Sequence, residues 1–193
     1  MVQRTKSKRG LSANGCKNAR GNPLLTETMK PKKFVPGLIV FDFDGVLTDN
    51  RVLVFDDGRE AVLCNRADGL AFDLFRRNGI PALILSTEKH PVVAARAKKL
   101  KVPCLQGVGN KKTALQNYCR KKRLRRADVL YVGNDVNDLV AMRIAGHRAC
   151  PSDAHPEVRA ICRIVLHSKG GEGVARELAE RVLRLRCEVI AGK

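Results

Sequence analysis

The chain reads LIVFDFDG over residues 38–45, and this stretch decides the fold. Its four leading residues are bulky and apolar, which predicts a strand of a parallel sheet that is buried on both faces. Asp42 and Asp44 come directly after that strand. Open α/β sheets place their active sites beyond the carboxyl ends of their strands, and Gly45 allows the backbone to turn away sharply. The stretch therefore predicts an α/β fold with both aspartates at its functional site.

Two carboxylates placed two residues apart can carry out paired chemistry. Neighbouring carboxylates resist double ionisation, so one can attack as a nucleophile while the other holds a proton. A carboxylate together with water and phosphate oxygens also satisfies the octahedral oxygen shell that Mg²⁺ requires. The alternative interpretation is structural, because aspartates often cap helices or occupy turns after a strand.

Strands and helices alternate from residue 38 onward, which predicts a Rossmann-like, doubly wound parallel sheet with crossover helices. Further strands are expected at 81–85, 102–105 and 128–132, with edge strands near 147–150 and 162–166. Helices are expected from about 68 to 79, from 91, from 111 to 123, before 145–146, between the two edge strands, and from 172 to 186. Two short apolar runs, 51–55 and 59–64, are joined by Asp-Asp-Gly and predict a β-hairpin.

Composition divides the 193 residues into a basic extension and one domain of ordinary size. Residues 1–36 hold nine Lys and Arg against one acid, Glu27, with no apolar periodicity, which predicts a disordered extension. A nucleic-acid-binding arm and a transit peptide are the alternatives for it. The folded domain is expected at 37–187 and a short tail at 188–193. Lys and Arg also crowd residues 96–126, where a solvated helix face or steering of anionic substrates is favoured over RNA binding.

Several classes of protein are excluded by what the sequence lacks. No apolar run approaches a membrane span, and no signal-peptide core precedes the first strand. The seven cysteines show no CxxC spacing, so neither a zinc site nor a disulfide framework is predicted. We therefore expect a soluble protein of the reducing cytoplasm, without a membrane or nucleic-acid partner.

Polar side chains follow the other predicted strands. Ser86 comes after the second strand, where a hydroxyl can bind a phosphate oxygen without adding charge; an N-cap serine is the alternative. Lys111 is predicted to begin a helix, where a cation is unfavourable against the helix dipole and needs a compensating anion such as phosphate. The alternatives are that Lys112 plays this part, or that Lys111 is simply solvated. Residues 133–138 read GNDVND after the fourth strand, so their oxygens would face Asp42 and complete a Mg²⁺ shell.

These motifs resemble, in order from about residue 37 to 185, those of the haloacid-dehalogenase phosphohydrolase superfamily. DFDGVLT at 42–48 is similar to the DxDGxxT motif, and GNDVND is similar to the fourth motif, GDxxxD. Ser86 and Lys111 match the second and third motifs. The resemblance implies a phosphatase in which Asp42 is phosphorylated and Asp44 is the general acid and base.

The resemblance also implies roles for the neighbouring polar residues. Ser86 and Thr87 would hold the phosphoryl group, and Lys111 would neutralise it. Mg²⁺ would be held by Asp42, Asp44 and either Asn134 or Asp135, because an asparagine stands where the metal-binding aspartate is usual. Asp138 would orient the lysine or a metal-bound water.

The chain resembles one branch of the superfamily in particular, since it has no insertion large enough for a cap domain and only the short hairpin at 51–64. That branch contains the 3-deoxy-manno-octulosonate 8-phosphate phosphatases, the sialic-acid-type 9-phosphate phosphatases and the C-terminal domain of N-acylneuraminate cytidylyltransferases. NRADG at 65–69 and KGGEGVARE at 169–177 are also similar to it. The resemblance implies a phosphorylated 2-keto-3-deoxy sugar acid as substrate, substrate contacts from Asn65 and Asp68, and a homotetramer in which a neighbour covers each site.

Two departures from the octulosonate enzymes affect the choice of substrate. Ser-Thr-Glu at 86–88 replaces their Thr-Gly-Arg, and Ala67 replaces an arginine. Arg66 is adjacent to Ala67, whereas Ser-Thr-Glu resembles the cytidylyltransferase-associated domains better and favours a nine-carbon or unusual ulosonic acid. It also leaves open a catalytically weak oligomerisation domain of the kind associated with the cytidylyltransferase.

Overall fold

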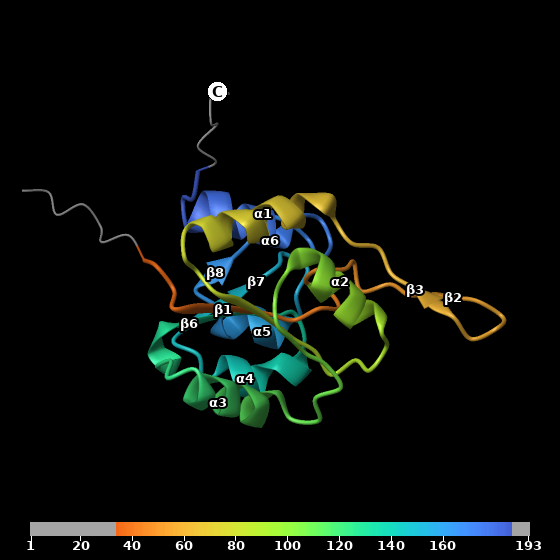
Figure 1. Ribbon diagram of the computed structural model, residues 1–193, viewed down its shortest axis with the longest axis horizontal. Helices are drawn as coiled ribbons and strands as arrows, with labels where there is room; N and C mark the ends of the chain where they lie inside the picture. The colour runs from red at the N-terminus through yellow and green to blue at the C-terminus, as the bar shows by residue number, and fades with distance from the viewer. Residues whose placement is uncertain (1–33, 187–193) are drawn as a thin grey trace, which may run out of the picture. The chain divides into compact units, whose positions relative to one another are not determined.

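The computed structural model describes residues 34–186 (Figure 1), so the basic extension lies almost entirely outside the described residues, as does the short C-terminal tail. A six-stranded sheet with the order β5-β4-β1-β6-β7-β8 forms its centre, and every neighbouring pair is parallel. Its strands are β1 (Leu38–Phe41), β4 (Ala82–Leu85), β5 (Cys104–Leu105), β6 (Val129–Val132), β7 (His147–Cys150) and β8 (Ile164–Val165). The predicted fold class, a doubly wound parallel sheet, is confirmed.

Helices cover both faces of the sheet (Figure 1). They are α1 (Arg66–Arg77), α2 (Val92–Leu100), α3 (Lys111–Lys121), α4 (Leu139–Met142), α5 (Pro156–Ile161) and α6 (Val174–Glu177). One core cluster joins α1, α2 and α6 to the sheet, and a second joins α3, α4 and α5. Within the described part of the chain, every helix is too short or too polar to cross a lipid bilayer.

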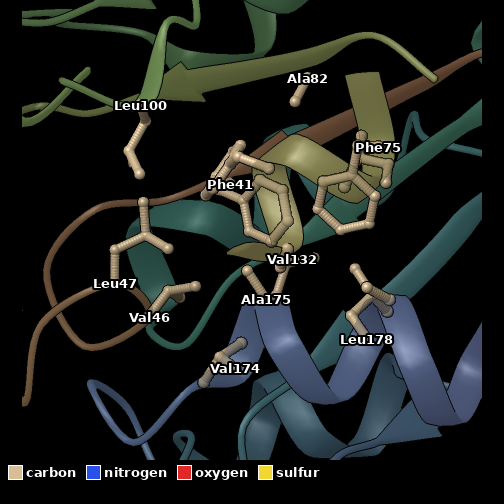
Figure 2. Close-up of a cluster of buried hydrophobic side chains, with 14 of the residues drawn as sticks. Phe41, Val46, Leu47, Phe75, Ala82, Leu100, Val132, Val174, Ala175 and Leu178 are labelled. Carbon is tan, nitrogen blue, oxygen red and sulfur yellow. The ribbon is translucent and has the colours of Figure 1, made fainter. Parts of the chain in front are cut away.

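The central strand shows why the LIVF run is apolar throughout. Successive side chains of a strand point to opposite faces, so Ile39 and Phe41 belong to one core cluster while Leu38 and Val40 belong to the other. All four are fully buried. Figure 2 shows the first cluster, in which Phe41 lies beside Phe75 of α1, with ring centroids 6.0 Å apart.

The last helix differs from the predicted continuous helix over 172–186. The α-helical part, α6, has only four residues and is followed by a π-helical turn at Leu178–Val182. The Leu183 N–H donates to the Leu178 carbonyl, an i to i+5 bond of 2.9 Å. The extra residue in this turn brings Leu183, rather than Val182, onto the fully buried face. A regular helical period could not have predicted that shift.

The hairpin projects from the domain (Figure 1) and is shorter than predicted. Its paired strands are β2 (Leu53–Val54) and β3 (Glu60–Ala61). Leu53 is 61% exposed and Leu63 is 72% exposed, so the hairpin presents an apolar surface to solvent. Val62 differs from them because it packs against the core.

Glu177 fastens the segment before α6 to that helix. Its carboxylate accepts the N–H groups of His167 at 2.9 Å and Ser168 at 2.7 Å, and pairs with Arg181 at 2.6 Å. Partial burial raises the pKa of Glu177, but these donors outweigh it and hold the pKa at about 2, against an ordinary value of 4.5.

We expect Glu177→Gln to lower the free energy of unfolding by about 2 kcal/mol at pH 7. The depressed pKa makes the stabilisation fully present above pH 4.5 and removes it as the pH falls through 2. Urea denaturation of both proteins at several pH values measures the difference, which should shrink below pH 4.5. A difference that grows on acidification would contradict this account, and Glu180→Gln in the π-helical turn that follows α6 is the matched control.

Candidate active site

Asp42 lies at the carboxyl end of the central strand and is 4% exposed. One carboxylate oxygen, Oδ1, accepts the N–H of Phe43 at 2.7 Å. The same oxygen lies 2.8 Å from the Lys111 ammonium. The structure thus joins the first and third predicted motifs, which are 69 residues apart in the sequence, in one buried ion pair.

Lys111 is held between two carboxylates. Its Nζ donates to Asp138 Oδ1 at 2.7 Å, and its side chain is 1% exposed. Asp138 also accepts the Tyr131 hydroxyl at 2.9 Å and the Asn134 N–H at 3.0 Å. Asp138 therefore orients the lysine, one of the two roles expected for it.

The helix cap decides which of two adjacent lysines enters the site. The Asn110 side chain accepts the Thr113 N–H at 3.0 Å, which fixes Lys111 as the first residue of α3. Lys111 turns inward, while Lys112 is exposed. The structure therefore places Lys111, and not Lys112, beside Asp42.

The electrostatics of the site follow from burial and from an imbalance of charge. Burial, with the Asp138 carboxylate nearby, raises the pKa of Asp42, and Lys111 opposes that rise. Burial lowers the pKa of Lys111, but the two carboxylates outweigh it and keep the ammonium charged. One ammonium faces two buried carboxylates, so Asp42 retains its proton to higher pH than usual unless a further cation lies nearby.

Asp44 occupies a wetter position than Asp42. It is half-buried, and burial raises the pKa of its carboxyl group, against the effect of a hydrogen bond from the Thr48 hydroxyl. Thr48 Oγ lies 3.4 Å from Asp44 Oδ1 and itself accepts the Gly45 N–H at 3.2 Å. A carboxyl group with a raised pKa retains its proton to higher pH, which suits a proton donor.

A small cavity of about 80 Å³ opens at these aspartates. It is far smaller than the roughly 300–1,000 Å³ of sites that enclose a whole organic ligand, so it would take a phosphoryl group and leave the rest of a substrate outside. Ser86 lies in its wall, 2% exposed, with Oγ accepting the Glu88 N–H at 3.0 Å. The lining residues are Asp42, Asp44, Asn50, Ser86, Thr87, Asn134, Asp135 and Asn137.

The donor atoms in this cavity fit a hard divalent cation. Asn134 Oδ1 is buried and has no hydrogen-bond partner, which is costly unless a ligand satisfies it. Asp135 is already engaged, since its side chain accepts the Val136 N–H at 2.7 Å and caps a short 3-10 helix. Within residues 34–186, no cluster of three or more His, Cys, Asp or Glu side chains is arranged to hold a metal. A cation here would therefore use the Asn134 amide oxygen beside the carboxylates.

Gly45 is required by the approach of Asn134. A Cβ atom on Gly45 would lie 1.9 Å from Asn134 Nδ2, and the residue has a φ of 76° that favours glycine. The Lys169-Gly-Gly motif also packs on this loop: a Cβ on Gly170 would lie 2.3 Å from the Gly45 carbonyl oxygen. The C-terminal motif thus packs against the loop that carries Asp42 and Asp44.

Two residues predicted to contact substrate lie outside the cavity lining. Asn65 caps α1, with its side chain accepting the Ala67 N–H at 2.9 Å. Asp68 is 1% exposed and accepts the N–H groups of Ala175 at 3.0 Å and Arg176 at 3.3 Å, which ties α1 to α6. The structure gives both side chains a role in holding helices.

Two asparagines that line the cavity were not predicted as site residues. Asn50 lies two residues beyond the DFDGVLT motif, and its N–H donates to Thr48 Oγ at 3.2 Å. Asn137 lies inside the GNDVND string. Their proximity to the motifs was the available signal, because a motif at the end of a strand places its neighbours at the same edge.

Comparison with known proteins agrees with this geometry. A family model for haloacid dehalogenase-like hydrolases matches residues 102–178. The 3-deoxy-D-manno-octulosonate 8-phosphate phosphatase KdsC of Salmonella typhi is 30% identical over 178 residues, which cover 92% of each chain. The N-acylneuraminate cytidylyltransferase A of Danio rerio is 27% identical over 161 residues, and this chain spans only 37% of its length.

Solved structures show the same fold. A HAD family hydrolase from Streptomyces avermitilis is 45% identical with a TM-score of 0.77, over 80% of this chain and 88% of that one. The 3-deoxy-D-manno-octulosonate 8-phosphate phosphatase of Moraxella catarrhalis, solved with magnesium, phosphate and KDO, is 29% identical with a TM-score of 0.75, over 79% and 87% of the two chains.

The chain belongs to the haloacid dehalogenase-like hydrolase family. Within that family it is a phosphatase related to the 3-deoxy-D-manno-octulosonate 8-phosphate phosphatases. The family predicted from the motifs is therefore confirmed, as is its capless branch.

Proposed function

We propose that the protein is a Mg²⁺-dependent phosphomonoesterase that acts on a phosphorylated 2-keto-3-deoxy sugar acid through an aspartyl-phosphate intermediate. The observation that carries the proposal is the arrangement at the end of β1, where Asp42 is paired with a buried lysine and lies beside the half-buried Asp44 in a phosphoryl-sized cavity. Relatives named as octulosonate phosphatases support the substrate class.

The reaction proceeds in two steps, formation and then hydrolysis of the aspartyl phosphate. Asp42 attacks phosphorus in line, a P–O bond to Asp42 forms, and the bond to the sugar oxygen breaks. Asp44 gives its proton to the leaving sugar oxygen and then takes one from the water that hydrolyses the aspartyl phosphate. Ser86 and the amide groups after Asp42 position the phosphoryl group.

Lys111 provides fixed positive charge throughout both steps. Its ammonium is already positioned by Asp138 and need not reorganise as negative charge shifts among the phosphoryl oxygens. Mg²⁺, when bound by Asp42, Asp44 and Asn134, would supply further neutralisation of those oxygens.

The test of this function is a screen of phosphate release from octulosonate, sialic-acid-type and other ulosonate phosphates, with and without Mg²⁺. Turnover of one of these esters that depends on Mg²⁺ is expected. An oligomer that releases no phosphate from any of them would instead support the second candidate, a catalytically weak assembly domain. The observation behind this second candidate is the similarity to the Danio rerio cytidylyltransferase.

The metal ligand can be identified by comparing two adjacent substitutions. We expect Asn134→Ala to weaken Mg²⁺ binding about tenfold or more, because its buried Oδ1 has no other partner. Asp135→Ala should weaken it less, since that carboxylate is engaged in its helix cap. Calorimetric titration of each protein with Mg²⁺ gives the affinity independently of turnover, and the reverse order would assign the role to Asp135.

We also propose that the protein is a homo-oligomer, a tetramer as in the related branch, in which a neighbour covers each site. The cavity leaves most of a sugar uncovered, and the hairpin exposes Leu53 and Leu63. Burial of such side chains between subunits is favourable by about 25 cal/mol per Å².

We expect Leu53→Lys with Leu63→Lys to dissociate the oligomer and to lower kcat/KM, while leaving the domain folded. Val62 is left unchanged because it packs on the core. Light scattering measures the mass, and Arg51→Glu with Arg59→Glu on the same hairpin is the control. A parent protein that is monomeric and fully active would refute the proposed assembly.

A further inference from the structure

A groove lies at the edge of the sheet opposite the catalytic aspartates. A cavity of about 530 Å³ is formed where β1, β4 and β5 begin and where α1, α2 and α3 end. A second cavity, of about 460 Å³, lies between α3 and the segment after β5. Both are lined by Tyr118 and Lys122, so they lie next to each other, and together they are here called the α3 groove. The catalytic cavity shares no lining residue with it.

The floor of the α3 groove is apolar. Phe75 and Ile80 come from the α1 side of the first cavity, and Leu105 and Val108 line the second. Tyr118 is half-buried between the two. Bulky apolar side chains of a ligand would therefore be removed from water in both cavities, which is the main source of affinity at such sites.

The rim of the groove is positively charged. Between Glu88 and Asp128 the chain carries thirteen Lys and Arg residues and no Asp or Glu. Lys101, Lys121 and Lys122 are exposed, line the groove, and take part in none of the ion pairs found within residues 34–186. No carboxylate lines either cavity.

Helix electrostatics explain only part of this charge. Cations in the last turn of a helix stabilise it, and Lys98 and Lys99 do so for α2 while Arg120 and Lys121 do so for α3. Lys101 and Lys122 lie beyond those helix ends. Their charges add to the rim without a carboxylate to neutralise them, so the groove is complementary to a negatively charged ligand.

We propose that the α3 groove binds an acidic segment of a partner protein, whose bulky apolar side chains enter the two cavities while its carboxylates meet the lysines of the rim. A peptide fits better than a nucleic acid because the groove is apolar at its floor. Proteins that bind single-stranded nucleic acids typically combine such a basic surface with exposed aromatic side chains on which the bases stack. Among the described residues, the one exposed large aromatic side chain is Phe55, which belongs to the hairpin.

The experiment uses the full chain and three fluorescein-labelled probes of equal length: a peptide of Glu and Leu, a peptide of Glu and Ser, and a single-stranded RNA. Fluorescence anisotropy measures each affinity at several salt concentrations. We expect the Glu–Leu peptide to bind about tenfold or more tightly than the Glu–Ser peptide. Its affinity should fall with salt, because the rim contributes by charge.

Two sets of variants locate the site. Lys101→Glu with Lys122→Glu should weaken Glu–Leu peptide binding about tenfold or more, and Asn117→Trp, which places an indole over the second cavity, should also weaken it. Arg143→Glu with Arg163→Glu reverses two exposed charges that do not line the groove and should leave binding unchanged. Thermal unfolding midpoints equal to that of the parent show that each variant is folded.

Three results would overturn the proposal. Equal binding of the two peptides would show attraction by charge alone, with no use of the apolar floor. Tighter binding of the RNA would identify the basic face as a nucleic-acid surface. An equal loss of binding in the Arg143 and Arg163 control would place the interaction outside the α3 groove.

Discussion

Replacement of Asp42 by Asn is expected to lower phosphate release by about three powers of ten or more. The amide is nearly isosteric with the carboxylate but cannot form the phosphoryl bond, so the covalent route is lost. Lys111 keeps its second partner, Asp138 at 2.7 Å, and should stay in place. Steady-state turnover of the preferred ulosonate phosphate measures the effect, and the thermal unfolding midpoint checks that the fold is intact.

Asp49→Asn is the matched control for this prediction. Asp49 lies close to the same loop but is paired with Arg51 at 2.7 Å and does not line the cavity. Its substitution should change turnover by no more than about threefold. An Asp42→Asn protein that keeps more than about a tenth of the parent turnover, with Asp49→Asn as the reference, would exclude Asp42 as the nucleophile.

The part of the site that the sequence could predict is the part carried by local pattern. An apolar run followed by two aspartates and a glycine specifies both the central strand and the chemistry at its end, within eight residues. Ser86 was predictable in the same way, because it follows the apolar strand β4 directly. Parallel strands bring such positions to one edge of the sheet, so each local pattern also predicted an approximate place in space.

Contacts between distant residues were not predictable from such patterns. Asp68 accepts hydrogen bonds from residues 107 and 108 positions later in the chain, and nothing in the NRADG string indicates that partner. Asn65 shows a related ambiguity, since an asparagine before a helix suits both a cap and a ligand. The role of Asp68 became visible only when α1 and α6 were packed together, and that of Asn65 only when its side chain was seen to accept the Ala67 N–H.

The choice between Lys111 and Lys112 required three-dimensional information of a different kind. Adjacent residues of a helix point about 100° apart, so the position of the first helical residue decides which side chain faces the site. That position is set by the Asn110 cap, which a sequence shows only as one of several polar residues before the helix. Because the structure places Lys111 in the site and Lys112 outside it, substitutions of the two lysines are expected to have different effects.

We expect Lys111→Met to lower turnover about a hundredfold or more and to lower the free energy of unfolding by about 3–5 kcal/mol. The substitution leaves Asp42 and Asp138 buried without the ammonium that lies 2.8 and 2.7 Å from them. Lys112→Met removes the same charge from an exposed position one residue away. It should change turnover by less than about threefold and stability by less than about 0.5 kcal/mol.

Urea denaturation and steady-state kinetics of the two lysine variants give both quantities. Addition of Mg²⁺ should restore part of the stability of Lys111→Met, because a divalent cation can compensate the uncovered carboxylates, while Lys112→Met should gain no more than the parent. Equal effects of the two substitutions would remove the buried ion pair from the mechanism. A loss confined to Lys112→Met would assign the third motif to that lysine and would contradict the cap-directed placement of Lys111.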